Sequence, residues 1–517
     1  MHIKVLNRSL NLSSISLVII IAGLVKFALH MYMAPGYGFF IDELYTMALS
    51  RHLAFGYVDL PPLVPALMAL SRAVLGESLL AMHIVPALAG VGTLVFACLI
   101  AREFGGRTFA VAMTALGFIF IPFWLTFDSF FCYDSIDQLV LAGFLYVLVR
   151  FIKSGNRRLW LLLGGIAGIA AMTKMTILFL GPGFLAALLI SRYRKDLLTP
   201  WPWLGAALCL AIVSPYLLWE AAHRWPTIEY WNNYGTLRVY KASLPQYLTN
   251  IIVYLNPLLL PFWLIGLYRL FRRLKGVNYG FLGVLFLITL TLLYFLHSSA
   301  RLVGELFIPL IGAACVFLEE LLSGAGWKRG LRALPVAYLL AAGPIVVPTA
   351  LPVLPIQYIY RSPQFVKTWY QSIREFNAPL SYAPFALTGR LEWEDFVRDV
   401  AGVWAKLPAE ERRVAGIYSS NYGTAGAIDL MGSRYGLPHA VSGALTYYLW
   451  GPGYSWDVML VVTGKMNYLS VLFEECTQTV TAGKKYENPM LADVNISVCR
   501  HPKVSPDVFW SKLKDYH

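Results

Sequence analysis

The sequence predicts an α-helical polytopic membrane protein that carries a smaller α/β domain at its C-terminal end. Of its 517 residues, 58% are hydrophobic and only 14% are charged, whereas soluble domains carry about 25% charged residues. Long apolar runs recur up to about residue 353, and many exceed the roughly 18 residues that a membrane-spanning helix needs. Beyond that point, shorter helix and strand patterns replace the apolar runs.

The apolar runs predict about eleven transmembrane helices, within a range of about 11 to 13. Their centres lie near residues 25, 90, 117, 145, 166, 184, 211, 258, 288, 311 and 342. The strands of a membrane barrel alternate apolar and polar residues, and these runs do not alternate. The first run, about Ile15 to Ala34, could be a signal peptide, but its length and the spans that follow favour a retained helix.

The net charge of +13 comes largely from basic residues in short loops between the apolar runs. Such loops mark the cytoplasmic side of a membrane protein, so we expect a cytoplasmic N-terminus in a multi-pass protein of the inner (plasma) membrane. No nucleic-acid-binding motif and no long basic run is present, so we expect no nucleic-acid partner. The cytoplasmic loops hold Arg102, Arg107, Arg150, Lys153, Arg157, Arg158, Arg192, Arg194, Lys195, Arg269, Arg272, Arg273, Lys275, Lys328, Arg329 and Arg332.

This topology divides the chain into a transmembrane domain, residues 1–353, and an extracytoplasmic α/β domain, residues 354–517. In the second domain, residues 389–413 have the pattern of an amphipathic helix, and residues 414–430 that of a strand, a loop and a helix. Residues 456–464 read as a buried strand. This domain could select the acceptor, bind polysaccharide or cover a site in the membrane domain.

Two local features of the exported domain bear on its chemistry. The loop with Gly423 and Gly426 lacks the dinucleotide-binding and P-loop spacings, which favours a plain turn over a phosphate-binding loop. Cys476 and Cys499 are the two cysteines of this domain, and in an oxidising compartment they could pair.

The predicted topology gathers acidic and basic residues at the outer face, although they come from loops that are distant in sequence. Ionisable residues at a membrane edge are candidates for function, and the alternative for each is a solvated loop charge. Asp42 is the strongest candidate because it directly follows an apolar run, and the segment after it predicts a helix in the interface with Arg51 on its polar side. The set comprises Asp42, Glu43, Asp59, Asp128, Asp134, Asp137, Lys174, His223, Arg224, Arg238, Lys241, His297, Arg301 and Glu305.

Several stretches resemble the bacterial branch of the protein O-mannosyltransferase-like family, which also includes the lipid A aminoarabinose transferases. The most specific feature is the acid pair in the first outer loop, followed by a short helix and a Pro-Pro re-entry. The likeness covers most of residues 15 to 270 in the same order. It rests on "IDELYTMALSRHLAFGYVDLPPLVPAL" (41–67), "FDSFFCYDSIDQLVL" (127–141), "GGIAGIAAMTKMTILFLGPG" (164–183), "WPWLGAALCLAIVSPYLLWEAAHRWPTIEYW" (201–231) and "LNPLLLPFWLIGL" (255–267).

The resemblance implies an integral membrane glycosyltransferase of the GT-C fold class. Such enzymes take a sugar from a polyprenyl-phosphate donor held in the lipid bilayer and pass it, with inversion, to a hydroxyl of a glycan, lipid or protein acceptor. This chemistry requires a carboxylate that deprotonates or holds the acceptor and cations that receive the phosphate charge. The family implies no organic cofactor, and a divalent cation (Zn, Mg or Mn) is an open possibility.

Family positions assign roles to the candidates. Asp42 matches the first-loop acid, the base or acceptor-binding group, with Glu43 as second choice or as a residue that orients the loop. Asp137 matches the acid of the second outer loop, Asp134 competes with it, and either could instead cap the helix that follows. Lys174 is a candidate phosphate ligand or a snorkelling lysine. The remaining substrate-binding candidates are Asp128, Arg224, Arg238, Lys241, Arg301 and Tyr57.

Asp59 and His223 correspond to positions where relatives can bind a metal, but two ligands are too few to define a site, which slightly favours no metal. Leu60 and the "LHSSARLVGELFIPL" junction (296–310) depart from the family pattern, so the sugar cannot be transferred from relatives. A transporter or flippase is the alternative function, because it would also need many spans. It should show an internal repeat and discontinuous helices near the bilayer centre, whereas no clear repeat is evident and the polar residues gather at one face.

Overall fold

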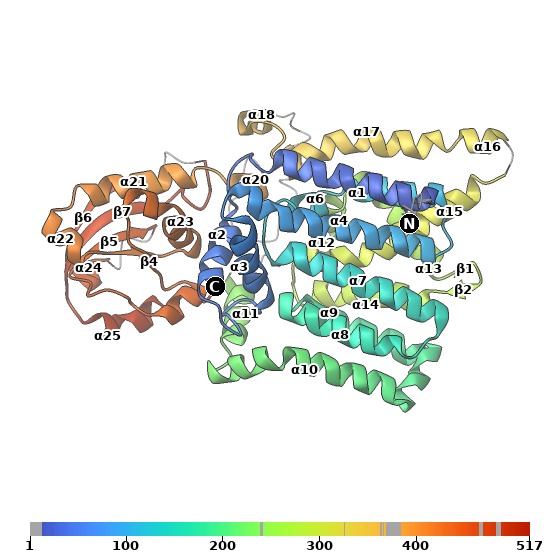
Figure 1. The fold of residues 1–517 in the computed structure, drawn as a ribbon, viewed down its shortest axis with the longest axis horizontal. Helices are drawn as coiled ribbons and strands as arrows, with labels where there is room; N and C mark the ends of the chain where they lie inside the picture. The colour runs from blue at the N-terminus through green and yellow to red at the C-terminus, as the bar shows by residue number, and fades with distance from the viewer. Residues whose placement is uncertain are drawn as a thin grey trace, which may run out of the picture.

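The computed structural model describes residues 13–517 except 238–240, 325, 362–363, 365–366, 369–383, 465–468 and 482–486. Figure 1 shows a bundle of roughly parallel helices with a smaller domain of mixed helices and strands beyond one of its ends. The helices α2, α3 and α11 lie between these two parts. A single set of buried apolar side chains runs from the bundle through α2 into the smaller domain, so the two parts share a continuous core.

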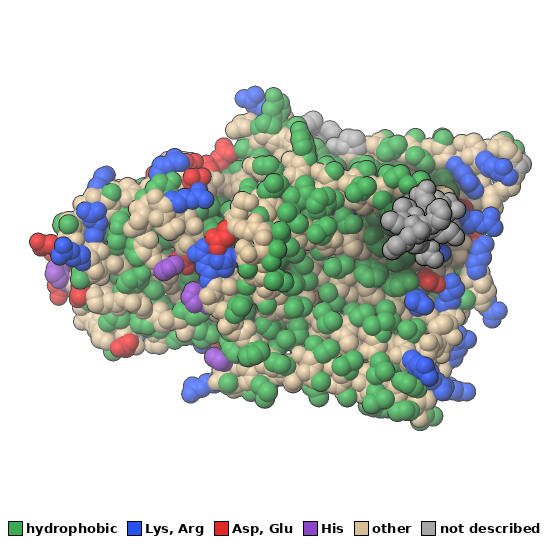
Figure 2. Space-filling view, in the orientation of Figure 1, with side chains coloured by type: hydrophobic (Ala, Val, Ile, Leu, Met, Phe, Trp, Pro, Cys, Tyr) green, Lys and Arg blue, Asp and Glu red, His purple; other side chains and the backbone are tan. Residues whose placement is uncertain are grey.

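Six helices in the described part of the chain are long and apolar enough to cross a membrane. On the face of the bundle shown in Figure 2, apolar side chains cover most of the surface between its two ends, as expected of a lipid-facing protein. The six are α1 (Ser14–Met33), α4 (Leu79–Glu103), α7 (Tyr133–Ser154), α10 (Pro200–Ala222), the segment Arg301–Leu321 that joins η3 (Ala300–Leu306) to α15 (Phe307–Leu321), and Gly326–Ala350, which contains α16 (Gly326–Gly330) and α17 (Ala333–Ala350).

Two helix pairs that bend sharply, by 99° and 94°, each have the composition of one broken span or of a re-entrant loop. They raise the number of candidate spans to eight among the described residues, whereas the sequence predicted about eleven. The other three predicted centres, 117, 166 and 288, fall on helices of 12 to 16 residues, which are short for a bilayer. The bent pairs are α9 (Thr176–Ile190) with η1 (Arg192–Leu198), and α12 (Leu244–Tyr254) with η2 (Pro257–Leu259) and α13 (Leu260–Leu270); the short helices are α5 (Thr108–Ile119), α8 (Leu159–Thr173) and α14 (Gly280–Phe295).

Lysine and arginine side chains gather at the end of the bundle opposite the smaller domain, as Figure 2 shows. The loops at that end include the hairpin of β1 (Arg273–Leu274) and β2 (Val277–Asn278). This segregation of charge is the pattern that the positive-inside rule requires of one membrane face. The candidate acids of the first outer loop lie at the other end, next to the smaller domain.

The helix α2 (Ile41–Arg51) begins where the Glu43 carboxylate turns back and accepts a hydrogen bond from the Phe40 amide at 2.8 Å. This contact satisfies one of the amides that a helix start leaves unpaired. Nine of the eleven residues of α2 are buried, so it is not the half-exposed interfacial helix that the sequence predicted. The helix is buried because α23 (Tyr422–Met431) of the smaller domain covers the side that α3 (Leu63–Leu75) leaves open.

The smaller domain contains a five-stranded mixed sheet with the order β4-β3-β5-β7-β6. The predicted strand and helix at 414–430 are confirmed as β3 (Gly416–Ser419) and α23, but the predicted loop glycines Gly423 and Gly426 lie within α23; the predicted buried strand is β5 (Val458–Thr463), in which every residue is buried. Cys476 and Cys499 face each other on neighbouring strands and form a disulfide. The other strands are β4 (Ala440–Val441), β6 (Phe473–Thr481) and β7 (Asn495–Pro502).

The predicted amphipathic helix at 389–413 is α21 (Trp393–Ala405) followed by the short α22 (Ala409–Val414). Buried side chains repeat along α21 at helical spacing and pack against α23, which holds α23 from the side away from α2. The remaining short elements are α6 (Pro122–Phe127), α11 (Pro226–Leu237), α18 (Ile356–Tyr360), α20 (Phe385–Thr388), η4 (Gly432–Tyr435), η5 (Leu445–Trp450), α24 (Leu469–Leu472), α25 (Pro506–Trp510) and η6 (Ser511–Leu513).

Candidate active site

Asp42 lies in the first turn of α2, at the junction between the bundle and the smaller domain. Its carboxylate accepts a hydrogen bond from the Tyr422 hydroxyl at 3.3 Å, and its side chain is partly exposed. Burial, reinforced by the negative charge of Asp134, raises the pKa of Asp42 to about 6, although Arg301 and Lys174 oppose the shift. Asp42 therefore lies within electrostatic range of one acid and two cations from elsewhere in the chain.

The Lys174 ammonium is 2.5 Å from the Asp134 carboxylate, and it lies 4.9 Å from the centre of the Tyr133 ring. Asp134 is in the first turn of α7, and Lys174 occupies the break between α8 and α9. The Lys174 side chain keeps 21% of its surface exposed, whereas Asp134 is nearly buried. The partly exposed Lys174 ammonium is thus held in place by the nearly buried Asp134 carboxylate.

Asp137 lies one helical turn further along α7 and is buried. Its carboxylate is 3.4 Å from the Thr173 hydroxyl, next to Lys174. Arg301, in η3, bonds the Ser299 hydroxyl and lies over the ring of Phe127 at 5.6 Å. The structure therefore brings together Asp42, Asp134, Asp137, Lys174 and Arg301, all of which the sequence predicted as site residues.

Glu43, the neighbour of Asp42 in sequence, has a different environment. Its side chain is 1% exposed, and one oxygen accepts a hydrogen bond from the Phe131 amide at 2.7 Å. The same oxygen lies 3.0 Å from Nε2 of His83 in α4. With the Phe40 bond described above, these contacts support the second of its two predicted roles, the orientation of the loop.

Asp128 is placed away from solvent, although the sequence suggested a substrate-binding role. Its carboxylate pairs with the Lys26 ammonium of α1 at 2.8 Å, and neither side chain is exposed. The next residue, Ser129, accepts a hydrogen bond at 2.6 Å from Arg390, a buried side chain of the chain's C-terminal part. Segment 128–131, which leads to Asp134, is therefore held by charged residues from three separate parts of the chain.

Asp59 and His223, the two metal-ligand candidates, have separate partners. The Asp59 carboxylate accepts a hydrogen bond from the Tyr45 hydroxyl at 2.6 Å, and burial raises its pKa to about 7. The His223 ring is exposed, stacks on Trp219 at 4.1 Å, and bonds the Trp219 carbonyl. Within the described ranges, no three His, Cys, Asp or Glu side chains are grouped so as to hold a metal ion. These residues do not fit a metal centre.

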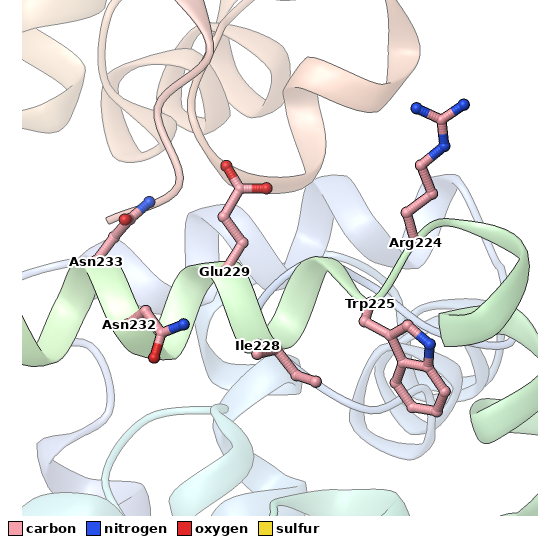
Figure 3. A pocket seen from close by; sticks show the side chains of 6 residues that line it. All are labelled: Arg224, Trp225, Ile228, Glu229, Asn232 and Asn233. Carbon is pink, nitrogen blue, oxygen red and sulfur yellow. The ribbon is translucent and has the colours of Figure 1, made fainter.

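The other substrate-binding candidates within the described residues have different surroundings. Tyr57 has no exposed surface, and its hydroxyl bonds backbone groups of the loop after α2, which favours a structural role. Lys241 is exposed, and Arg238 lies outside the described residues. Arg224 lines an open pocket of about 380 Å³ along α11. Figure 3 shows Arg224 and Glu229 on the side of α11 near the smaller domain, with Trp225 and Ile228 on the opposite side.

Sequence reasoning missed three residues that contact Asp42 or the segment leading to Asp134, namely Lys26, Tyr422 and Arg390. Lys26 left a signal, because it is a lysine within an apolar run, where a charge requires a partner. Tyr422 and Arg390 left none, because nothing in their local sequence reveals that they contact the first and second outer loops.

Comparisons with known proteins show what one stretch of the sequence and the overall fold are similar to. Residues 59–219, fewer than a third of the chain, match the family model described as "Dolichyl-phosphate-mannose-protein mannosyltransferase". This stretch contains Asp134, Asp137 and Lys174. No curated protein matches the chain in a sequence comparison.

Several solved structures share the fold at low sequence identity. ArnT from Cupriavidus metallidurans, solved with undecaprenyl phosphate bound, aligns with a TM-score of 0.56 and 13% identity over 93% of this chain and 97% of its own. The arabinofuranosyltransferase AftD from Mycobacteria aligns with a TM-score of 0.50 and 14% identity over 93% of this chain and 40% of its own. The Archaeoglobus fulgidus oligosaccharyltransferase, solved with Zn and sulfate, aligns with a TM-score of 0.51 and 12% identity over 80% of this chain and 61% of its own.

The likenesses to solved structures concern the fold, and the family match concerns the stretch that supplies most of the cluster. The chain is therefore similar to the dolichyl-phosphate-mannose-protein mannosyltransferase family over residues 59–219, and its fold is similar to that of ArnT.

Proposed function

We propose that the chain moves a sugar from a polyprenyl-phosphate donor to the hydroxyl of an envelope glycan, lipid or protein, with inversion at the anomeric carbon. The observation that supports this most directly is that the charges of Lys174 and Arg301 act on the Asp42 carboxyl. A base and two cations within electrostatic range of one another are what a displacement with a phosphate leaving group requires.

In this reaction Asp42 is the base. The acceptor oxygen forms a bond to the anomeric carbon while the bond from that carbon to the phosphate oxygen breaks, and the acceptor proton passes to Asp42. A carboxyl with a pKa of about 6 is mostly ionised at pH 7 and still basic enough to take a proton. Its partial exposure leaves room for an acceptor to approach.

Lys174 and Arg301 receive the negative charge that builds on the phosphate. Lys174 is paired with Asp134 before the donor binds. The donor phosphate would therefore bind an ammonium group that Asp134 already holds in position. Such preorganised charge lowers the barrier because little rearrangement is needed during the reaction. Asp134 and Asp137 are then free to accept hydrogen bonds from sugar hydroxyls, as the resemblance implied.

The proposal includes a topology. Eleven spans, a cytoplasmic N-terminus and an exported domain at 354–517 would put Asp42 at the outer face of the inner membrane. This agrees with the basic residues at the opposite end of the bundle. A lipid-borne donor can diffuse to a site at that depth. Undecaprenyl phosphate, present in the ArnT structure, is a molecule of this class.

The test is reconstitution of the purified protein in liposomes with polyprenyl phosphates that carry a hexose, a pentose or an aminopentose. Extracted envelope glycans, lipids and exported proteins serve as acceptors. We expect one donor to be converted to free polyprenyl phosphate, with the sugar mass appearing in one acceptor class. Asp42→Asn should lower turnover by about 100-fold or more while the protein remains folded.

Asp395→Asn is a matched control, because Asp395 is also in the first turn of a helix but lies exposed on α21. It should leave turnover unchanged. A transporter would behave differently, since flux could persist in Asp42→Asn without any covalent change of the lipid. Consumption of no donor by the wild-type protein, or equal consumption by the wild type and Asp42→Asn, would refute the proposed function.

A further inference from the structure

The exported domain contacts the helix that carries Asp42 at van der Waals distance. A Cβ atom added at Gly426 of α23 would lie 2.8 Å from the backbone of Leu44 in α2, and one added at Gly423 would lie 2.3 Å from the Ile41 side chain. Even a methyl group does not fit between these helices. The two glycines therefore allow close helix packing rather than a turn, and the sequence expectation for this loop is corrected.

This packing brings two hydroxyls of the exported domain to the acids around α2. The Tyr422 hydroxyl donates to Asp42 at 3.3 Å. The Thr446 hydroxyl lies 2.9 Å from the Tyr45 hydroxyl, which itself donates to Asp59. The Thr446 oxygen also accepts a hydrogen bond from the Val58 amide, so this part of the exported domain is joined to both ends of the first outer loop.

We propose that Tyr422 is a positioning residue for Asp42, so that the exported domain forms one wall of the active site rather than a separate accessory module. The inference rests on the proposed function, since it assigns Tyr422 to the orientation of the proposed base. The hydroxyl donates to one carboxylate oxygen and leaves the other available to the acceptor. A carboxylate held in this way has fewer orientations to lose when the acceptor binds.

The electrostatic effect of Tyr422 has a definite sign. A hydrogen bond to the carboxylate form lowers the pKa of Asp42, against the effect of burial. The other groups that face Asp42 are Asp134, Tyr133 and Cys132 at the start of α7, Lys174, Arg301 and Asp59. Removal of the Tyr422 hydroxyl leaves all of these in place and should raise the pH at which Asp42 loses its proton.

The test is Tyr422→Phe in the reconstituted full-length protein, measured with the donor that the wild type uses. We expect kcat to fall about tenfold, as for the loss of a hydrogen bond to a charged group. The KM for the donor should be unchanged, and the acid limb of the pH–rate profile should move to higher pH. Tyr454→Phe is the control, because it removes a hydroxyl of the same domain that bonds the His439 carbonyl instead.

A second variant preserves the shape of the side chain. Fluorotyrosine at position 422 is a stronger hydrogen-bond donor, and it should move the acid limb to lower pH, opposite to Tyr422→Phe. A merely structural role would not reverse the direction of the shift. An unchanged kcat and pH profile in both variants, beside an active wild type, would overturn the inference and leave the proposed function standing.

The glycine contact offers an independent measurement. Gly426→Ala should force α23 away from α2 and lower kcat as Tyr422→Phe does. Gly402→Ala in α21 is the matched control, because a Cβ atom there meets no atom within 4 Å. Equal kcat in these two alanine variants would show that the distance between the exported domain and Asp42 is unimportant. A wild type that consumes no donor would instead count against the proposed function itself.

Discussion

The Lys26 ammonium lies 2.8 Å from the Asp128 carboxylate, and neither side chain has any exposed surface. Lys26 belongs to α1, and Asp128 ends α6 just before the segment that leads to Asp134. Asp128 also packs closely on α4, since a Cβ atom at Gly90 would lie 2.3 Å from its carboxylate. The pair therefore joins the first span to the segment that leads to Asp134, an acid of the proposed site.

Replacing one member of this ion pair should destabilise the protein more than replacing both. Lys26→Met leaves a buried carboxylate alone, which costs about 3 to 5 kcal/mol. The double variant Lys26→Met with Asp128→Leu removes both charges and should regain most of that stability. Thermal unfolding in detergent would measure the difference, and a double variant as unstable as the single one would contradict this account.

Glu43 should matter for stability more than for chemistry. Glu43→Ala leaves the amides of Phe40 and Phe131 and the His83 ring without their acceptor, at a cost of about 3 kcal/mol or more. Glu77 also pairs with two side chains, Arg51 and Arg72, but is 40% exposed, so Glu77→Ala should cost at most about 1 kcal/mol. Equal melting temperatures for the two alanine variants would argue against the role given to Glu43.

The acid limb of the pH–rate profile should reflect the ionisation of Asp42. Since the base works when ionised and its pKa is raised to about 6, turnover should fall as the pH drops through that value and level off above it. Rates measured from pH 5 to pH 8 would define the limb. A limb near pH 4, the ordinary range of an aspartate, would indicate that Asp42 is not the group observed.

Lys174 should affect turnover more than the binding of the donor lipid. Lys174→Gln keeps a polar side chain but loses the charge that faces the leaving phosphate, so kcat should fall by about 100-fold. Lys406→Gln, at the exposed end of α21, is the control and should have no effect. Steady-state kinetics with a radiolabelled donor would separate kcat from KM. A higher KM at constant kcat would reassign Lys174 to binding alone.

The disulfide between Cys476 and Cys499 should stabilise the exported domain. It closes a loop with a sequence separation of 23 residues, for which the chain-entropy model gives about 3 kcal/mol. Replacing both cysteines with serine should lower the melting temperature of the protein in detergent. No change in melting temperature would mean that the sheet holds β6 and β7 together without the bond.

The sequence by itself determined where the apolar helices of the bundle lie. Ten of the eleven predicted centres fall on α-helices and the one at 258 falls on η2, because hydropathy over a window of residues is a local property of the chain; six to eight candidate spans are found among the described residues. The elements β3, α23 and β5 of the smaller domain were also predictable, since their apolar spacing matches the period of a strand or a helix. The acids and cations of the proposed site were predicted from their places at the expected outer ends of the spans.

The tertiary structure decided which of these residues share a site. Asp42 and Glu43 are adjacent, but successive side chains of a helix point about 100° apart, so one meets Tyr422 and the other meets His83. Tyr422 is 380 positions from Asp42, and Lys174 is 40 positions from Asp134. Contacts of this kind depend on how helices pack against each other, and no local pattern of residues encodes that packing.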